Sequence, residues 1–190
     1  MIDNTTHLGD ALAYEDCLPL SWRLSGTEPS PAYFSGLNDK NEEIIKSILI
    51  LEKHHYESAD EDTDRNAIDL ARIDFKVNLL LDLMVQVYSK ELDIPPETDV
   101  SLRSSQLQWC SDQVHQQGEY LFVDLYLSRR YPRPLTLYGR VYGVEVQEQN
   151  GYRINLDLDQ VSPSVQDLLE RFIFLKHRRM VASVRSEHNL

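Results

Sequence analysis

Arginine is the residue type in this sequence with the clearest potential for binding chemistry. Arg129 and Arg133 stand four residues apart in an R-x-x-x-R arrangement. A guanidinium group offers parallel N–H donors that match the oxygens of a phosphate, so such a pair could bind an anion. The same residues lie where we expect a connection between two strands, and there a solvated basic loop is the simpler interpretation. We favour the loop and keep anion binding as the alternative.

The residue patterns of enzymes and metal sites do not occur in the sequence. We find no Ser/His/Asp order, no phosphate loop and no paired carboxylates in a glycine-framed cleft, so we expect no catalytic residues and no enzyme activity. His54–His55 lack a second ligand pair at metal-binding spacing, and the acidic run 57–64 lacks the glycine and glutamate of an EF-hand. We therefore expect no metal and no cofactor. Cys17 and Cys110 are far apart in sequence, and we expect two reduced, dispensable thiols.

The last part of the chain predicts strands of a small β-barrel followed by a helix. Residues 120–127 and 152–158 alternate between apolar and polar types, which is the period of half-buried strands. Between them, residues 135–146 contain Gly139 and Gly143, which indicate a bend or a close approach of the backbone. Ser162–Pro163 then begins a helix with a capping side chain and a suitable first residue. Its apolar stripe, which should pack on the barrel, is Val165, Leu168, Leu169, Phe172 and Leu175.

Two earlier segments show weaker strand signals. Residues 1–38 lack sustained periodicity, but 18–24 alternate like a strand that pairs at a barrel edge. In the expected first barrel strand, the apolar residues change phase between Leu102 and Leu107. This slip predicts a turn or bulge near Ser104–Ser105.

The middle region, residues 39–94, predicts two helices. Residues 42–56 form a helix of about four turns, and 65–91 continue without proline or glycine until Pro95–Pro96. The second helix carries apolar residues at heptad spacing. This seam consists of Leu70, Ile73, Val77, Leu80, Met84 and Val87, and a neighbouring apolar face consists of Ile68, Phe75, Leu79 and Leu83. We expect the shorter helix and the barrel to cover one face and another copy of the chain to cover the other; the alternative buries both faces within one protomer.

Charge is distributed unevenly along the chain. The net charge is −12, and residues 1–117 hold 9 Lys and Arg against 22 Asp and Glu, whereas residues 118–190 hold 10 against 9. This balance argues against a nucleic-acid partner. No apolar run approaches bilayer length, and residues 1–4 lack the charged and apolar regions of a signal peptide, so we expect a cytoplasmic protein without membrane contact. The basic run 176–179 is either a partner-binding surface or a solvated helix end that interacts with its own dipole.

The order of these segments resembles the PilZ domain family. The family's "grV" strand, "gyr" strand and "LerfI" helix correspond to residues 139–141, 151–153 and 168–173. Residues 18–22, 107–109 and 177–179, with the helical middle, are similar to the atypical, helix-extended branch. The resemblance implies an α+β fold, with a small antiparallel barrel and C-terminal helix in residues 95–190 and an oligomerisation region in residues 39–94. It also implies a homo-oligomer, with a tetramer as the favoured state.

Typical members of this family are receptors for cyclic di-GMP, a bacterial second messenger. They hold it with an R-x-x-x-R arm before the first barrel strand and a [DN]-x-S-x-x-G turn. Here Ser101, Arg103 and Gln106 occupy the three named positions of the turn, and a register three residues earlier keeps Asp and Ser but ends on Ser104. The glycine is missing under either register. The segment 87–99 ahead of the expected first strand contains no arginine.

The resemblance and the altered motifs together predict a non-enzymatic signalling protein. We interpret it as an oligomeric adaptor that contacts other signalling proteins and binds cyclic di-GMP weakly or not at all. The alternative is a working cyclic di-GMP receptor with a noncanonical surface. Its candidate ligand residues are Arg103, Arg129, Arg133 and Arg140.

Overall fold

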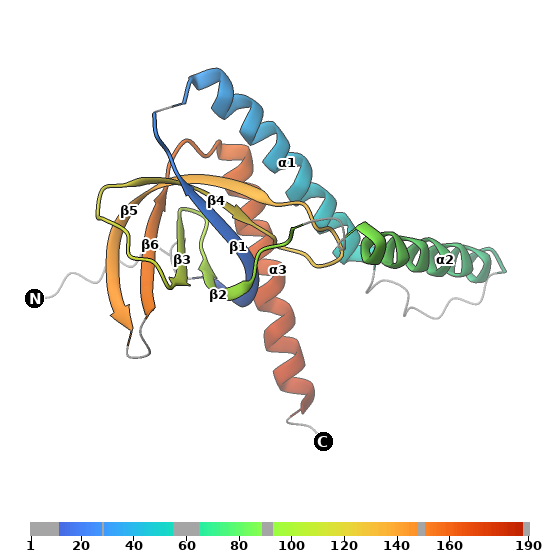
Figure 1. The fold of residues 1–190 in the computed structure, drawn as a ribbon. Helices are drawn as coiled ribbons and strands as arrows, with labels where there is room; N and C mark the ends of the chain where they lie inside the picture. The colour runs from blue at the N-terminus through green and yellow to red at the C-terminus, as the bar shows by residue number, and fades with distance from the viewer. Residues whose placement is uncertain (1–11, 28, 55–64, 89–92, 148–150, 188–190) are drawn as a thin grey trace, which may run out of the picture.

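Six strands form a closed antiparallel barrel at the centre of the molecule. The computed structural model describes residues 12–27, 29–54, 65–88, 93–147 and 151–187 (Figure 1). The strands are β1 (Tyr14–Leu24), β2 (Glu97–Leu102), β3 (Gln106–Ser111), β4 (Tyr120–Leu125), β5 (Leu135–Gln147) and β6 (Gly151–Leu158), and the helices are α1 (Pro31–His54), α2 (Arg65–Tyr88) and α3 (Pro163–Glu187). Around the barrel the strand order is β1-β2-β3-β6-β5-β4. The predicted α+β barrel with a C-terminal helix is confirmed.

Strand β1 closes the barrel. Its residues Tyr14–Pro19 pair with β2, and its residues Leu20–Leu24 pair with β4. The strand expected to pair at a barrel edge is therefore part of a closed barrel, with its first half paired on one side and its second half on the other. The expected first strand is also divided: β2 and β3 form a hairpin, in which Val100 lies opposite Trp109 and Leu102 opposite Leu107. The predicted turn near Ser104–Ser105 is confirmed as the tip of this hairpin.

Helices α1 and α3 pack against each other and against the barrel (Figure 1). Ile45 and Ile48 of α1 and Leu169 and Phe172 of α3 are fully buried in the same core as the inward-facing strand residues. The backbone N–H of Val165 donates to Oγ of Ser162 at 3.3 Å, so the predicted start of α3 is confirmed. The N-cap residue thereby satisfies one of the free N–H groups of the first turn.

Helix α1 begins at Pro31, eleven residues before the predicted start at residue 42. Its first turns lie over the outside of β4 and β5, where Phe34 packs with Phe122 and Tyr138. Phe122 is therefore buried although it points away from the barrel interior. The expected division after residue 38 falls inside this helix.

Strand β5 is irregular where its glycines indicated. A Cβ added to Gly139 would lie 2.3 Å from the carbonyl oxygen of Asp157 and 2.9 Å from Cγ of Leu156. The pairing of β5 with β6 shifts between Val141 and Gly143, as in a β-bulge. Both parts of the sequence prediction, the close approach and the bend, are confirmed.

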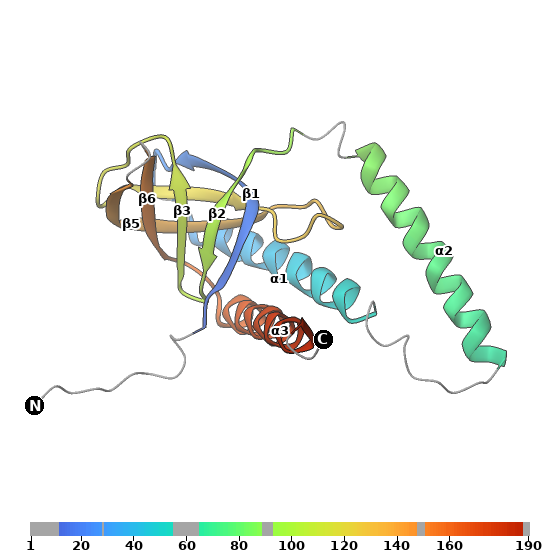
Figure 2. The same ribbon diagram turned by 90° about the horizontal axis from the view of Figure 1, so that it is seen from below.

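Helix α2 projects away from the barrel (Figure 2). Its side chains are described from residue 70 to residue 87, apart from residue 71. All six seam residues are exposed, and so are Phe75, Leu79 and Leu83. The expectation that α1 and the barrel cover one apolar face is wrong, and so is the alternative that both faces are buried within one protomer. The predicted helix end at residues 89–91 and the acidic run 57–64 lie outside the described residues.

Candidate functional site

The β2–β3 turn holds the positions that correspond to the family motif. The backbone N–H of Arg103 donates to the carbonyl of Gln106 at 2.8 Å and closes the turn. Nε2 of Gln106 donates to Oδ1 of Asp157 on β6 at 2.9 Å. Position 106 is therefore filled by a side chain tied to a neighbouring strand, where glycine would leave the backbone open to a ligand.

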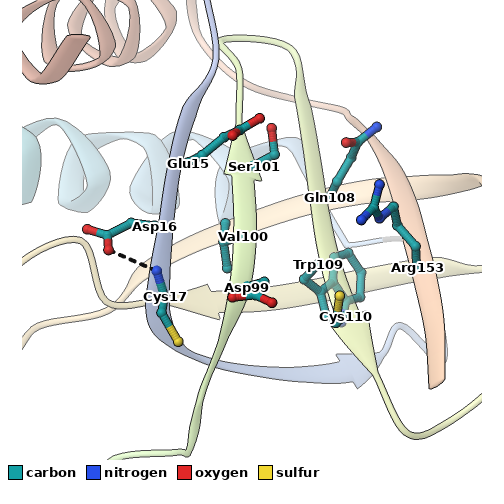
Figure 3. Close-up of a pocket in the computed structure, with 10 residues that line it drawn as sticks. All are labelled: Glu15, Asp16, Cys17, Asp99, Val100, Ser101, Gln108, Trp109, Cys110 and Arg153. Carbon is teal, nitrogen blue, oxygen red and sulfur yellow. Dashed lines mark hydrogen bonds between the residues drawn. The ribbon is translucent and has the colours of Figure 1, made fainter. Parts of the chain in front are cut away.

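Ser101 faces a surface that is mainly acidic. It lies between Glu15 of β1 and Gln108 of β3, at the edge of a hollow of about 460 Å³. Figure 3 shows Glu15, Ser101 and Gln108 pointing to the same side of the strands. Asp16 and Asp99 also line the hollow, against one basic residue, Arg153. Three carboxylates and one guanidinium make this surface unfavourable for a dianion.

The acidic surroundings affect the protonation of the Cys17 thiol. Partial desolvation and the carboxylates of Asp99, Glu97 and Asp16 raise the pKa of Cys17 above its usual value, because each disfavours the thiolate. Cys17 and Cys110 flank Asp99 and line the same hollow (Figure 3). Because they lie two strands apart, their Cα atoms are separated by about 10 Å, beyond the reach of a disulfide. Both cysteines are free.

The arginines of the R-x-x-x-R segment are engaged by carboxylates of other elements. Arg129 pairs with Glu97 at 2.8 Å, and Arg133 pairs with Glu43 at 3.3 Å. Arg133 also donates to the hydroxyl of Tyr131 at 3.2 Å. These contacts agree with the interpretation of the segment as a basic surface loop.

The four candidate ligand arginines do not converge on one place. Arg129 contacts Glu97 at the start of β2, whereas Arg103 follows the end of that strand, about 20 Å away. Arg140 lies on the outer face of β5 opposite Asp157, which in turn lies opposite Gln106. Arg140 is thus two strands, or about 10 Å, from the turn. Within the described part of the chain, neither Arg103 nor Arg140 has an ion pair.

The basic run at residues 176–179 is partly occupied within the protomer. Lys176 and Arg179 both pair with Glu52 of α1, Lys176 at 2.6 Å, and Arg179 also donates to the Glu52 carbonyl at 3.1 Å. His177 and Arg178 are exposed. Two of the four side chains of the run therefore join α3 to α1. Neither the partner-binding interpretation nor the solvated-helix-end interpretation included this contact.

Sequence reasoning missed the acidic residues Glu15 and Asp16 that face the β2–β3 hairpin. They could have been found from the alternation in residues 14–24 if that segment had been placed beside β2.

No group of three or more His, Cys, Asp or Glu side chains suited to a metal occurs among the residues that the structure describes. None of the described helices is both long and apolar enough to span a membrane.

The large exposed apolar surface of α2 is the other candidate site. The exposed fractions of Leu70, Met84 and Val87 are 67%, 68% and 67%, and Phe75 on the neighbouring face is 69% exposed. Contiguous apolar surfaces of this kind on soluble proteins mark interaction sites. The arrangement can therefore support protein association, in a part of the molecule separate from the β2–β3 turn.

The fold and these sites define a six-stranded barrel module with a projecting apolar helix. The sequence profile described as "Atypical PilZ domain, cyclic di-GMP receptor" matches residues 45–186, and the chain belongs to this family. No curated protein matches the sequence significantly.

Solved structures include a close match in fold. A pathogenic protein from Xanthomonas campestris, a tetrameric PilZ domain self-assembled via a helical bundle, has a TM-score of 0.72 and 23% identity, over 92% of this chain and 93% of that one. The PilZ domain of YcgR from Escherichia coli with cyclic di-GMP has a TM-score of 0.38 and 14% identity, over 47% of this chain and 77% of that one. The inhibitor of motility MotI/DgrA from Bacillus subtilis has a TM-score of 0.38 and 15% identity, over 45% of this chain and 42% of that one.

Proposed function

We propose that this protein is a non-enzymatic, homo-oligomeric PilZ adaptor that assembles through α2, as a tetramer. The observation that carries the proposal is the exposure of every seam residue of α2 in the single chain. An apolar stripe of this length is an association liability unless other helices cover it. A second copy of the same helix is a partner that matches the seam in length and spacing.

The second apolar face of α2 supports an assembly larger than a dimer. With 100° between successive residues, the centre of the face formed by Phe75, Leu79 and Leu83 lies roughly 130° from the centre of the seam. A two-stranded coiled coil buries only one such face. Two neighbours per helix would bury both, which requires at least three helices. The Xanthomonas campestris protein of the same fold is a tetramer held by a helical bundle, which favours four.

Weak binding of cyclic di-GMP is the second part of the proposal. Gln106 stands where glycine is needed, and Glu15, Asp16 and Asp99 surround the hollow next to the turn. If each of two missing arginine contacts costs about 1.5–3 kcal/mol, the loss is about 3–6 kcal/mol. A micromolar site would then become millimolar or weaker.

Light scattering on the intact protein tests the assembly. We expect a mass close to four times the 22.1 kDa chain at micromolar concentration. The double variant Val77→Glu/Met84→Glu should give smaller species and keep the circular dichroism of the fold. Lys40→Glu, a change at an exposed position of α1 that lies outside both apolar faces of α2, is the control and should keep the mass. A mass near 22.1 kDa for the unaltered chain would contradict the proposal.

One observation favours the alternative of a receptor with a noncanonical surface. Arg103 and Arg140 have no ion-pair partner among the described residues; Arg140 lies opposite Asp157 on β6, and Arg103 lies beyond Gln106, on the other side of Asp157. Loss of binding in Arg103→Ala or Arg140→Ala would support this alternative, provided that the unaltered protein binds cyclic di-GMP.

A further inference from the structure

The loop between β4 and β5 reaches three other elements through three arginines. Arg129 pairs with Glu97 of β2 at 2.8 Å, Arg130 pairs with Asp82 of α2 at 3.2 Å, and Arg133 pairs with Glu43 of α1 at 3.3 Å. Each carboxylate belongs to a different element, so the loop is the point where the barrel, α1 and α2 are joined electrostatically.

Tyr131 fixes the middle of this loop to the body of the protein. Its ring is partly buried against the main core, and its hydroxyl accepts a hydrogen bond from Arg133. The backbone N–H of Tyr131 donates to Ser128, and the N–H of Arg133 donates to Tyr131 at 2.8 Å. The arginines therefore extend from a turn that is itself held in place, which lowers the entropy lost when they form ion pairs.

Helix α2 is separated from α1 at this point by a groove. The groove has a volume of about 330 Å³, with Ile50 and Leu51 on the α1 side, Asn78 and Leu81 on the α2 side, and Tyr131 at the loop. Because the groove leaves the facing helix surfaces loosely packed, apolar contact does not define the angle between α1 and α2. Arg130 and Asp82 line the same groove, and their ion pair connects the β4–β5 loop to the α2 side.

We propose that the β4–β5 loop positions the oligomerisation helix, with Arg130 and Asp82 as the pair that fixes the direction in which α2 leaves the barrel. The consequence for the assembly rests on the proposed function: the pair would set how four barrels are arranged around the helical bundle. The side chains of both residues are close to half exposed, at 45% and 43%. A pair of this kind is individually weak and sensitive to salt. The direction of α2 should therefore be well defined at low ionic strength and less so at high ionic strength.

Distances between spin labels on α2 and on the barrel test this positioning role directly. Labels at Gln86→Cys and Val146→Cys, in a Cys17→Ser/Cys110→Ser background, report the direction of the helix. Labelled chains are diluted with an excess of unlabelled chains, so that distances within one chain dominate. We expect a narrow distribution at low salt, and a width about twofold larger in Arg130→Asp and in Asp82→Arg. The swapped double variant Arg130→Asp/Asp82→Arg should return the narrow distribution, because it restores the pair with its charges exchanged.

Controls separate this proposal from a general loss of structure and from the proposed function. Arg178→Asp changes an exposed charge on α3 and should leave the width unchanged. A salt concentration near 1 M, where the Debye length is about 3 Å, should broaden the distribution of the unaltered pair. The positioning role would be overturned if the single variants gave distance distributions as narrow as that of the unaltered protein. It would also be overturned if the swapped double variant gave a distribution as broad as those of the single variants. Light scattering on the same samples tests assembly independently. A monomeric protein whose distance distribution still broadens in the single variants would contradict the proposed function and leave the positioning role intact.

Discussion

At the scale of single residues, two positions show how one side chain, present or absent, shapes the barrel. Gln106 fills the tip of the β2–β3 hairpin and is held by Asp157, so the hairpin keeps its shape and loses the open backbone that the family motif provides. At Gly139 the absence of a side chain is required, because the backbone of β6 passes so close that a Cβ would not fit. The sequence identified both positions, from the motif comparison and from glycine within a strand.

A pair of glycine substitutions tests the close packing at Gly139. In Gly139→Ala the new Cβ would meet the carbonyl oxygen of Asp157 at 2.3 Å, and we expect the free energy of unfolding to fall by about 2–3 kcal/mol. Gly36→Ala, on the exposed face of α1 with nothing within 4 Å, should raise it by about 0.5–1 kcal/mol. Urea denaturation of both variants measures the difference. Equal effects of the two changes would show that the approach at Gly139 is not tight.

The acidic environment of Cys17 predicts slow reaction with thiol reagents. Desolvation and the neighbouring carboxylates raise its pKa, so the reactive thiolate is scarce at pH 8. In a Cys110→Ser background, Asp99→Asn should lower that pKa and raise the alkylation rate several-fold, with the pH–rate curve shifted to lower pH. Asp39→Asn, a change at an exposed carboxylate of α1, should leave the rate as it was. An unchanged curve for Asp99→Asn would mean that the carboxylate does not influence the thiol.

At the scale of elements, periodicity predicted the regular parts and failed where tertiary contacts decide. The alternation in residues 120–127 and 152–158 was sufficient to place β4 and β6, because each strand directs its alternate apolar residues into the barrel. The start of α1 was missed because residues 31–38 contain Gly36 and Asn38 and have no apolar period. There Asn38 bonds to the carbonyl of Gln160 and accepts from the N–H of Ser162, contacts that only the folded chain provides. One local signal was available: Ser30–Pro31 has the form of the Ser162–Pro163 helix start, and the N–H of Tyr33 donates to Oγ of Ser30.

Asn41 connects α1 to β5 and gives a test of that contact. Its Nδ2 donates to the carbonyl of Thr136 at 2.8 Å, and its Oδ1 accepts from the Thr136 N–H at 3.2 Å. Asn41→Leu would leave both backbone groups unpaired beneath the helix, and we expect a loss of about 1–3 kcal/mol of folding free energy. The exposed neighbour Lys40→Leu should change stability by less than about 0.5 kcal/mol. Comparable urea midpoints for the two variants would argue against a stabilising role for this contact.

At the scale of the whole molecule, the apolar helix and the altered motif turn lie in separate regions. Helix α2 stands clear of the barrel, whereas the turn lies on the side of the barrel that carries Glu15, Asp16 and Asp99 (Figures 1 and 3). The heptad seam could be read from sequence because its period is local. The separation of the candidate arginines could not be read from the sequence, because it depends on which strands are neighbours. Residues 1–13 precede the first barrel strand in the structure and contain no arginine or lysine. Residues 87–99, which precede β2, contain Lys90 and no arginine.

The separation of these two regions predicts that assembly does not depend on ligand binding. Calorimetric titration of cyclic di-GMP into the intact, assembled protein is the most direct test of the proposed adaptor role. We expect no saturable heat up to ligand concentrations of about 100 μM, as for a dissociation constant near 1 mM or weaker. A micromolar dissociation constant that is lost in Arg103→Ala or Arg133→Ala, with the oligomer mass unchanged, would contradict the adaptor role and identify the protein as a receptor.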